Sequence, residues 1–258
     1  MKSVWLIAGS VLIEAVRRKE IYAIIVIALI LIAGVMSIDF FQMTGLFKFY
    51  FEVALKIMSI STALLVIVMS ASQLSREFEN RTIYTLLAKP VSRLTFMAGK
   101  LLGILMAAAF CFGLFMLIFV IGTYYLGAKI YWTHFLEYVY LQLIMMAVLA
   151  NLGFLLSLLM NLDAAITLGV VFFITSNIYT TGISYIYDYV NKVGQAILLF
   201  LNYAIPQITL FDFSEKTVHA DVWDPLSLKV MIYLSLYALF FIALYFTLSF
   251  IVFRRKAL

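Results

Sequence analysis

The sequence predicts an all-α integral membrane protein that crosses the bilayer six times within one transmembrane domain, residues 1–258. Of its 258 residues, 66% are hydrophobic and only 12% are charged, and the mean hydropathy is +1.10. Soluble domains carry charge on about a quarter of their residues. The apolar runs here are continuous and reach about 20 residues, the length that an α-helix needs to cross the hydrocarbon core.

Residues 1–20 are expected to form an N-terminal elbow helix that lies along the cytoplasmic membrane surface. Glu14 interrupts the short apolar part, and the basic cluster Arg17–Lys19 stands where a signal peptide would have its cleavage site. Trp5 can anchor such a helix at the interface. The six spans are then expected at about residues 21–38, 53–73, 94–126, 137–160, 164–181 and 228–253.

Residues 183–227 are the longest region of mixed polarity between two spans. Asp188 and Lys192 would be costly at membrane depth, so we expect an interfacial helix there and not another span. Of the 18 Lys and Arg residues, 12 fall in segments expected on one side of the membrane and six on the other. Because positive charge is enriched on the cytoplasmic side, both termini are expected inside. The net charge of +5 therefore reflects orientation and does not predict nucleic-acid binding.

The one long polar stretch between two apolar runs on the basic side begins with a helix signal. Ser75 is placed to cap a helix, and Glu77 stands four residues before Arg81, a spacing that favours a helical ion pair. Pro90 then forces a corner, after which Ser92 is placed to cap the next helix. The pattern predicts a rigid elbow at the water face over residues 75–93. It is either a docking surface or a loop that only fixes the topology.

Three runs in this region are distinctive: EFENRTI (77–83), LLAKPVSR (86–93) and GKLLG (99–103). Together they resemble the signature segment of type-2 ABC exporter permeases, although Arg81 stands where many relatives have Gly. The resemblance implies that this elbow is a coupling helix that seats on a separate ATPase subunit, which would bind the ATP and Mg²⁺. The residues so implied in ATPase coupling are Arg76, Glu77, Glu79, Arg81, Thr82, Lys89, Pro90 and Arg93.

The sequence lacks the residues that a self-powered transporter or an enzyme would use. Gly99-Lys100 is not followed by Ser or Thr, so there is no phosphate-binding loop. The two histidines, His134 and His219, stand apart in expected outer loops, where solvent would surround them. The middles of the spans contain no ionisable residue for a coupling ion. We therefore expect no cofactor and no metal in this chain, and energy supplied by a partner.

Mild polar residues mark a candidate transport path. Four of them share one face of the second span, and in the resembled family the second and fifth spans approach the dimer axis and the path. The candidates are Ser59, Thr62, Ser70 and Gln73, with Thr167 and Thr175 on the fifth span. The alternative is that such side chains bond to their own helix or join two helices.

A second pattern is a ridge of small residues on the third span. Gly99, Gly103 and Ala107 recur every four residues and so lie on one side of a helix. Small residues let two helix backbones approach closely, and the ridge is therefore predicted to pack against another helix.

Residues and resemblance together predict the permease subunit of an ATP-driven exporter in a bacterial or archaeal plasma membrane. Its expected partners are two copies of an ABC ATPase subunit, a second permease subunit in a homodimer, and membrane lipids. One alternative is a permease of the same build that serves the maturation of a periplasmic protein, as for nitrous oxide reductase, with residues 183–227 as the contact. Another is an intramembrane enzyme acting on lipids, against which the missing catalytic constellation counts.

Overall fold

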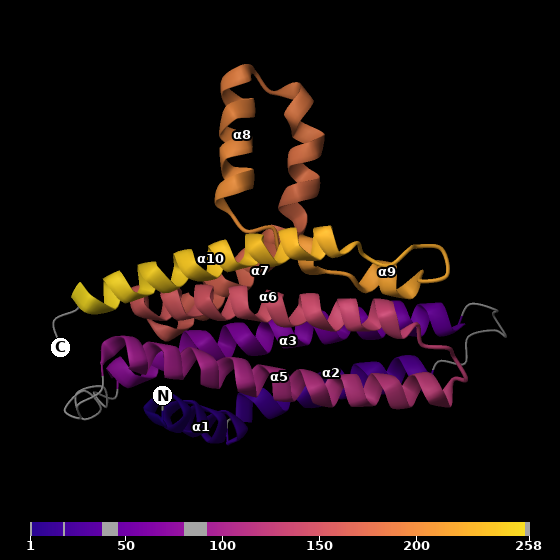
Figure 1. Ribbon diagram of the computed structural model, residues 1–258, viewed down its shortest axis with the longest axis horizontal. Coiled ribbons are helices and arrows are strands. Elements are labelled where there is room, and N and C mark those ends of the chain that lie inside the picture. The colour runs from indigo at the N-terminus through magenta and orange to yellow at the C-terminus, as the bar shows by residue number, and fades with distance from the viewer. Residues whose placement is uncertain (1, 18, 38–45, 80–91, 256–258) are drawn as a thin grey trace.

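The computed structural model describes residues 2–17, 19–37, 46–79 and 92–255, and every regular element among them is a helix (Figure 1). These elements are α1 (Lys2–Val16), α2 (Lys19–Ser37), α3 (Leu46–Glu79), α5 (Arg93–Tyr125), α6 (Trp132–Leu159), α7 (Leu162–Ile186), η1 (Tyr187–Tyr189), α8 (Lys192–Ala204), η2 (Ile208–Phe211), α9 (Ser214–Val218) and α10 (Leu228–Arg255).

Four long helices, α3, α5, α6 and α10, lie side by side and form the body of the molecule (Figure 1). Each contains an apolar stretch of 28 to 33 residues, long enough to cross a membrane. The apolar segments of α1, α2, α7 and α8 are shorter, between 10 and 17 residues. By length and composition, the described residues thus supply four candidate spans where the sequence predicts six.

The long helices run between two ends of the molecule. We call the end where α3, α6 and α10 finish the terminal end, because both chain termini lie toward it, and the other the α9 end (Figure 1). Since α6 and α10 run in the same direction, the chain between them must return across the bundle. The first half of α7 begins that return. Likewise α1 and α2, placed one after the other, lead from the terminal end to the start of α3 (Figure 1).

Aromatic rings fill the core near the α9 end. The ring centre of Phe119 lies 5.8 Å from that of Tyr50 and 5.5 Å from that of Phe135, and both pairs are stacked. The Tyr50 hydroxyl donates to the carbonyl of Phe119 at 3.2 Å, and the Tyr138 hydroxyl donates to the carbonyl of Leu55 at 3.0 Å. Buried tyrosine hydroxyls require such partners, and these bonds fix α3 against α5 and α6.

Helix α1 packs lengthwise against the first turns of α5. A Cβ atom added to Gly99 would lie 2.9 Å from Cβ of Ile7, and one added to Gly103 would lie 2.6 Å from Cβ of Val11. Four-residue steps along both helices bring these pairs together, so α1 runs beside α5 in the same direction. The sequence predicts a helix lying flat on the membrane surface. The difference arises because the glycines open a groove that takes the apolar side of α1.

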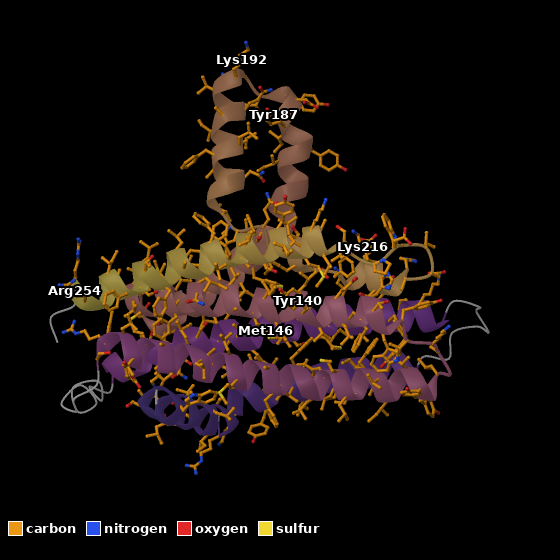
Figure 2. All side chains as sticks on the ribbon, viewed as in Figure 1. Tyr140, Met146, Tyr187, Lys192, Lys216 and Arg254 are labelled. Carbon is orange, nitrogen blue, oxygen red and sulfur yellow. The ribbon has the colours of Figure 1, made fainter. Side chains whose placement is uncertain are left out.

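The last turns of α7 and all of α8 form a hairpin that stands clear of the bundle (Figure 1). Lys192 lies at its tip (Figure 2), beside Asn191, whose side chain caps α8. Val193, Ile197 and Phe200 are between 55% and 71% exposed on one side of α8. The sequence predicts a helix within 183–227 but not its projection from the bundle. Such an apolar surface needs lipid or another protein to cover it.

Candidate functional site

At the terminal end, Glu77 and Lys100 form a buried ion pair between α3 and α5. Oε1 of Glu77 lies 2.6 Å from Nζ of Lys100, and the two side chains are 14% and 7% exposed. Nζ of Lys100 also donates to Oε1 of Gln73 at 3.2 Å and lies 5.8 Å from the ring centre of Phe96. The charge of Lys100 is therefore satisfied inside the bundle, where it joins two neighbouring helices.

The sequence does not predict this pairing. It predicts an exposed carboxylate at Glu77 that pairs with Arg81 or reaches an ATPase, whereas Glu77 is 14% exposed and contacts Lys100. Arg81 lies outside the described residues. Burial raises the pKa of Glu77 because it desolvates the carboxylate, and the ammonium of Lys100 opposes that shift. The partner stands on the next long helix, so no local spacing could indicate it.

The prediction that Ser75 caps the start of a new helix is also wrong, because α3 continues without a break to Glu79. Ser75 is buried and does not cap a new helix. Its Oγ donates to the carbonyl of Ser157 at 3.3 Å, which ties α3 to α6. Four predicted coupling residues lie outside the described part of the chain: Arg81, Thr82, Lys89 and Pro90. The described residues likewise do not include the side chains of Arg76 and Glu79.

Ser92 caps α5 as predicted, since its Oγ accepts a hydrogen bond from the backbone nitrogen of Thr95 at 3.1 Å. The next residue, Arg93, is another predicted ATPase contact, and it is engaged within the chain. Its Nη1 donates to the carbonyls of Phe253 and Arg254 at 3.0 and 3.1 Å. A guanidinium at these last carbonyls also complements the dipole of α10. Arg93 thus ties the start of α5 to the end of α10.

Three of the four predicted path residues on α3 bond to their own helix or to a neighbouring helix and do not line the cavity described below. Oγ1 of Thr62 accepts a hydrogen bond from Nε2 of Gln142 on α6 at 2.8 Å. Oγ of Ser70 donates to a carbonyl of its own helix. The same oxygen lies against α6, because a Cβ atom added to Gly153 would be 1.9 Å from it. Gln73 accepts its bond from α5, as described above. These contacts correspond to the alternative role, in which polar side chains bond to their own helix or join two helices.

A cavity of about 740 Å³ lies between α3 and α7 and is bordered by α6, η2 and α9. Of the six predicted path residues, Ser59 lines it. Thr167 and Thr175 lie on exposed turns of α7, outside the lining. The size of the cavity falls within the range of about 300–1,000 Å³ that is usual for small-molecule sites.

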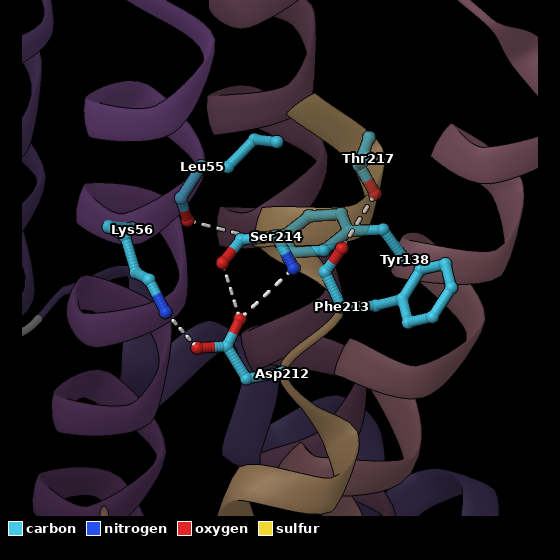
Figure 3. Close-up of polar contacts among 7 residues, drawn as sticks. All are labelled: Leu55, Lys56, Tyr138, Asp212, Phe213, Ser214 and Thr217. Atoms are coloured by element: carbon cyan, nitrogen blue, oxygen red, sulfur yellow. Dashed lines mark hydrogen bonds and ion pairs between the residues drawn. The ribbon is translucent and has the colours of Figure 1, made fainter. Parts of the chain in front are cut away.

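Lys56 and Asp212 form an ion pair (Figure 3), and both side chains line the polar end of this cavity. Oδ1 of Asp212 also accepts hydrogen bonds from the backbone nitrogen and the hydroxyl of Ser214, at 3.1 and 2.6 Å. Burial would raise the pKa of Asp212, but the hydrogen bonds from Lys56 and Ser214 outweigh it and hold the pKa below its usual range. The carboxylate therefore fastens the beginning of α9 to α3.

Further contacts hold residues 212–227, which we call the cap segment, over the α9 end. Lys48 pairs with Asp221 at 2.9 Å. Nε2 of His134 lies 2.9 Å from a carbonyl oxygen of the cap segment. The carboxylate of Glu137 accepts a hydrogen bond at 3.0 Å from a backbone nitrogen of the same segment. His134 is 3% exposed, not solvated as the sequence predicts. The only local signal of this attachment is the i,i+3 spacing of His134 and Glu137 on one side of α6.

Residues 5–258 match the family model described as ABC-2 family transporter protein. The chain belongs to the ABC-2 transporter family. A search of curated proteins gives no match. Members of this family are the multi-pass membrane component of an ABC transporter, so the family implies a partner ATPase subunit.

In this ABC-2 permease, two features stand out among the described residues. One is the set of polar contacts, buried between α3, α5 and α6 and partly buried at α10, that joins these helices at the terminal end. The other is the cavity between α3 and α7, with its charged rim near the α9 end. No group of three or more His, Cys, Asp or Glu placed to hold a metal ion occurs in the described ranges. The arrangement offers a binding space and a set of mechanical ties.

Proposed function

We propose that this chain is the permease subunit of an ATP-driven exporter in a bacterial or archaeal plasma membrane. Two permease subunits would form a homodimer, and two copies of a separate ATPase subunit would power it. The observation that carries the proposal is the family match over residues 5–258. The cavity between α3 and α7 supports it by offering a place for cargo within the bundle.

The permease crosses the membrane six times, with the terminal end in the cytoplasm. The directions of the helices support this, because both the chain before α3 and the chain between α6 and α10 must pass from the terminal end to the α9 end. The shorter helices α2 and α7 would complete these two passes. Arg254 and Arg255 lie at the terminal end, as expected for the cytoplasmic side.

Coupling to the ATPase takes place through residues 80–91, between the end of α3 and the start of α5. The ties described above support this placement. Glu77 and Lys100 join α3 to α5, and Arg93 joins α5 to α10. A force applied to the connecting segment would therefore move three long helices together and could alter the space between α3 and α7.

The test is the double variant Arg81→Glu/Lys89→Glu, made in the permease expressed together with its ATPase subunit. We expect normal membrane insertion, reduced recovery of the ATPase on purification, and loss of transport-linked ATP hydrolysis in reconstituted vesicles. Lys129→Glu is the control, because it reverses the charge of an exposed residue toward the α9 end. It should retain normal recovery of the ATPase and transport-linked ATP hydrolysis. Full ATPase binding and full coupled activity in the double variant would show that the segment only fixes topology.

The maturation alternative remains supported by one observation, the apolar hairpin that projects from the bundle. A photo-crosslinking amino acid in place of Tyr189, which is 90% exposed, would identify what covers the hairpin in cells. Crosslinks to a second permease chain or to lipid would favour the exporter dimer. A crosslink to one periplasmic protein would favour a permease that serves its maturation.

A further inference from the structure

The cavity between α3 and α7 is polar at one end and apolar along its walls. Its polar lining residues are Lys56, Ser59, Thr209, Asp212 and Glu215. Apolar side chains from four elements form the rest, among them Ile60, Met145, Phe173 and Ile208. Such a lining favours a molecule that is itself amphiphilic, with an apolar body and a polar head.

The charges of the lining residues do not cancel. Lys56 is neutralised by its ion pair with Asp212. Glu215 is exposed at the start of α9 and makes no ion pair with any described residue. The neighbouring Lys216 does not line the cavity, because its ammonium lies 5.3 Å from the centres of two aromatic rings of the cap segment. One negative charge is therefore left over at the polar end.

This excess charge decides which head group fits. An anionic head would meet the carboxylate of Glu215 and would have to separate Lys56 from Asp212 before it could pair. A neutral head would leave the carboxylate without a counter-charge beside an apolar surface. A cationic head would pair with Glu215 and leave the Lys56–Asp212 ion pair intact, so it is the head group whose charge the cavity favours.

We propose that the α3–α7 cavity binds an amphiphile with an apolar body and a single cationic head group, of the class of long-chain amines and quaternary ammonium compounds. The head lies beside Glu215, and the body lies against α3 and α7. The claim that such a molecule is the cargo rests on the proposed function. The claim that it binds in the cavity does not rest on that function, because the cavity lies within the permease alone.

The test measures binding to the full-length permease in nanodiscs of phosphatidylcholine, without ATPase and without ATP. The probes are decyltrimethylammonium and decyl sulfate, which share a chain and differ in the sign of the head group, and the signal of empty nanodiscs is subtracted. We expect the cation to bind about tenfold more tightly than the anion, the effect of roughly one favourable charge contact. The preference should weaken as salt is added, because Glu215 is exposed.

Two variants and a control assign the effect to the cavity. Glu215→Gln should remove most of the preference for the cation. Asp224→Asn, which removes the same charge from an exposed residue of the cap segment outside the cavity lining, should keep it. Ile174→Trp, which fills the cavity from an exposed position on α7, should weaken both probes. Equal binding of the two probes, tighter binding of the anion, or an unchanged preference in Glu215→Gln would each overturn the proposal.

A separate measurement distinguishes this inference from the function on which its cargo role rests. Vesicles that contain the permease and its ATPase would be tested for ATP-dependent movement of decyltrimethylammonium. Binding with the expected preference but without such movement would leave the site in place and reject its role as the cargo site. Movement of other cargo without any binding of the cation would support the exporter and reject the site.

Discussion

The charged side chain of Lys100 is buried inside the bundle, and the ion pair with Glu77 offsets the cost of burying it. Replacing it by Met should leave the buried carboxylate of Glu77 without a counter-charge. Breaking one side of a buried pair typically costs about 3–5 kcal/mol. We expect Lys100→Met to lower the thermal unfolding temperature of the purified permease. The double variant Lys100→Met/Glu77→Gln should recover much of the loss, and a single variant as stable as the parent would contradict the role of the pair.

The same variant should show a characteristic dependence on pH. Burial already raises the pKa of Glu77, and removing Lys100 removes the charge that opposes this shift. An acid whose folded-state pKa is raised is stabilising while protonated and loses that contribution as the pH rises. The defect of Lys100→Met should therefore be larger at pH 8 than at pH 5. Unfolding temperatures measured at both values test this, and a defect that grows toward low pH would argue against it.

Asp212 should respond to pH in the opposite sense. Its folded-state pKa lies below the ordinary value of about 3.9, so its contribution to stability is present above that value and is lost only as the pH falls through the lower, folded pKa. Between pH 5 and 8, amide exchange of α9, corrected for the intrinsic rate, should stay constant. Lys56→Met should increase that exchange at every pH in this window. Lys129→Met, which removes a charge outside the cap segment, should not.

Among the helices, α5 allows a sharp comparison of two glycines. At Gly103 a Cβ atom would lie 2.8 Å from the carbonyl oxygen of Ala8, whereas at Gly113 it would meet no atom within 4 Å. Overpacking of a close contact typically costs about 1–3 kcal/mol. Gly103→Leu should push α1 away from α5, and Gly113→Leu on the same helix should be tolerated. A disulfide formed between cysteines placed at Ile7 and Gly99 would report the contact, and its formation in Gly103→Leu would contradict the packing.

Comparing sequence and structure helix by helix shows where local patterns are sufficient. Ser92 follows a proline corner and precedes an apolar run, and these neighbours specify the cap that the structure contains. Ser75 has similar neighbours, but its hydroxyl bonds to the backbone of α6, so the predicted cap is absent. The polar face of α3 was visible in the sequence. Whether a member such as Thr62 lines a space or bonds to Gln142 depends on which helix packs beside it.

For the molecule as a whole, composition alone predicts a helical membrane protein, because no soluble domain has so little charge. The candidate cavity could not be predicted, since Lys56 and Asp212 are brought together from distant parts of the chain. The projection of the α7–α8 hairpin could not be predicted either. Periodicity marks α8 as a helix with one apolar side but does not indicate what that side contacts.

The proposed six crossings make a prediction for the two ends of α10. Cysteines would replace Asp224, just before α10, and Arg255, its last residue, in a protein whose buried Cys111 is changed to Ala. A membrane-impermeant maleimide added to intact cells should label position 224 and leave position 255 unlabelled until the membrane is opened. Equal labelling of both positions from outside would mean that α10 does not cross the membrane.

The unequal lengths of the apolar segments have a consequence for how the chain enters the membrane during synthesis. The apolar parts of α2 and α7, Tyr22–Gly34 and Leu162–Ser176, are shorter than the roughly 20 residues that span a bilayer unaided. Helix α7 packs on α3 and α6, which the ribosome has completed before α7 emerges. Helix α2 packs chiefly on α3, which is made after it. With α2 and α7 as the first and fifth of the proposed six passes, α7 is received by finished neighbours, whereas α2 must wait at the membrane surface until α3 arrives.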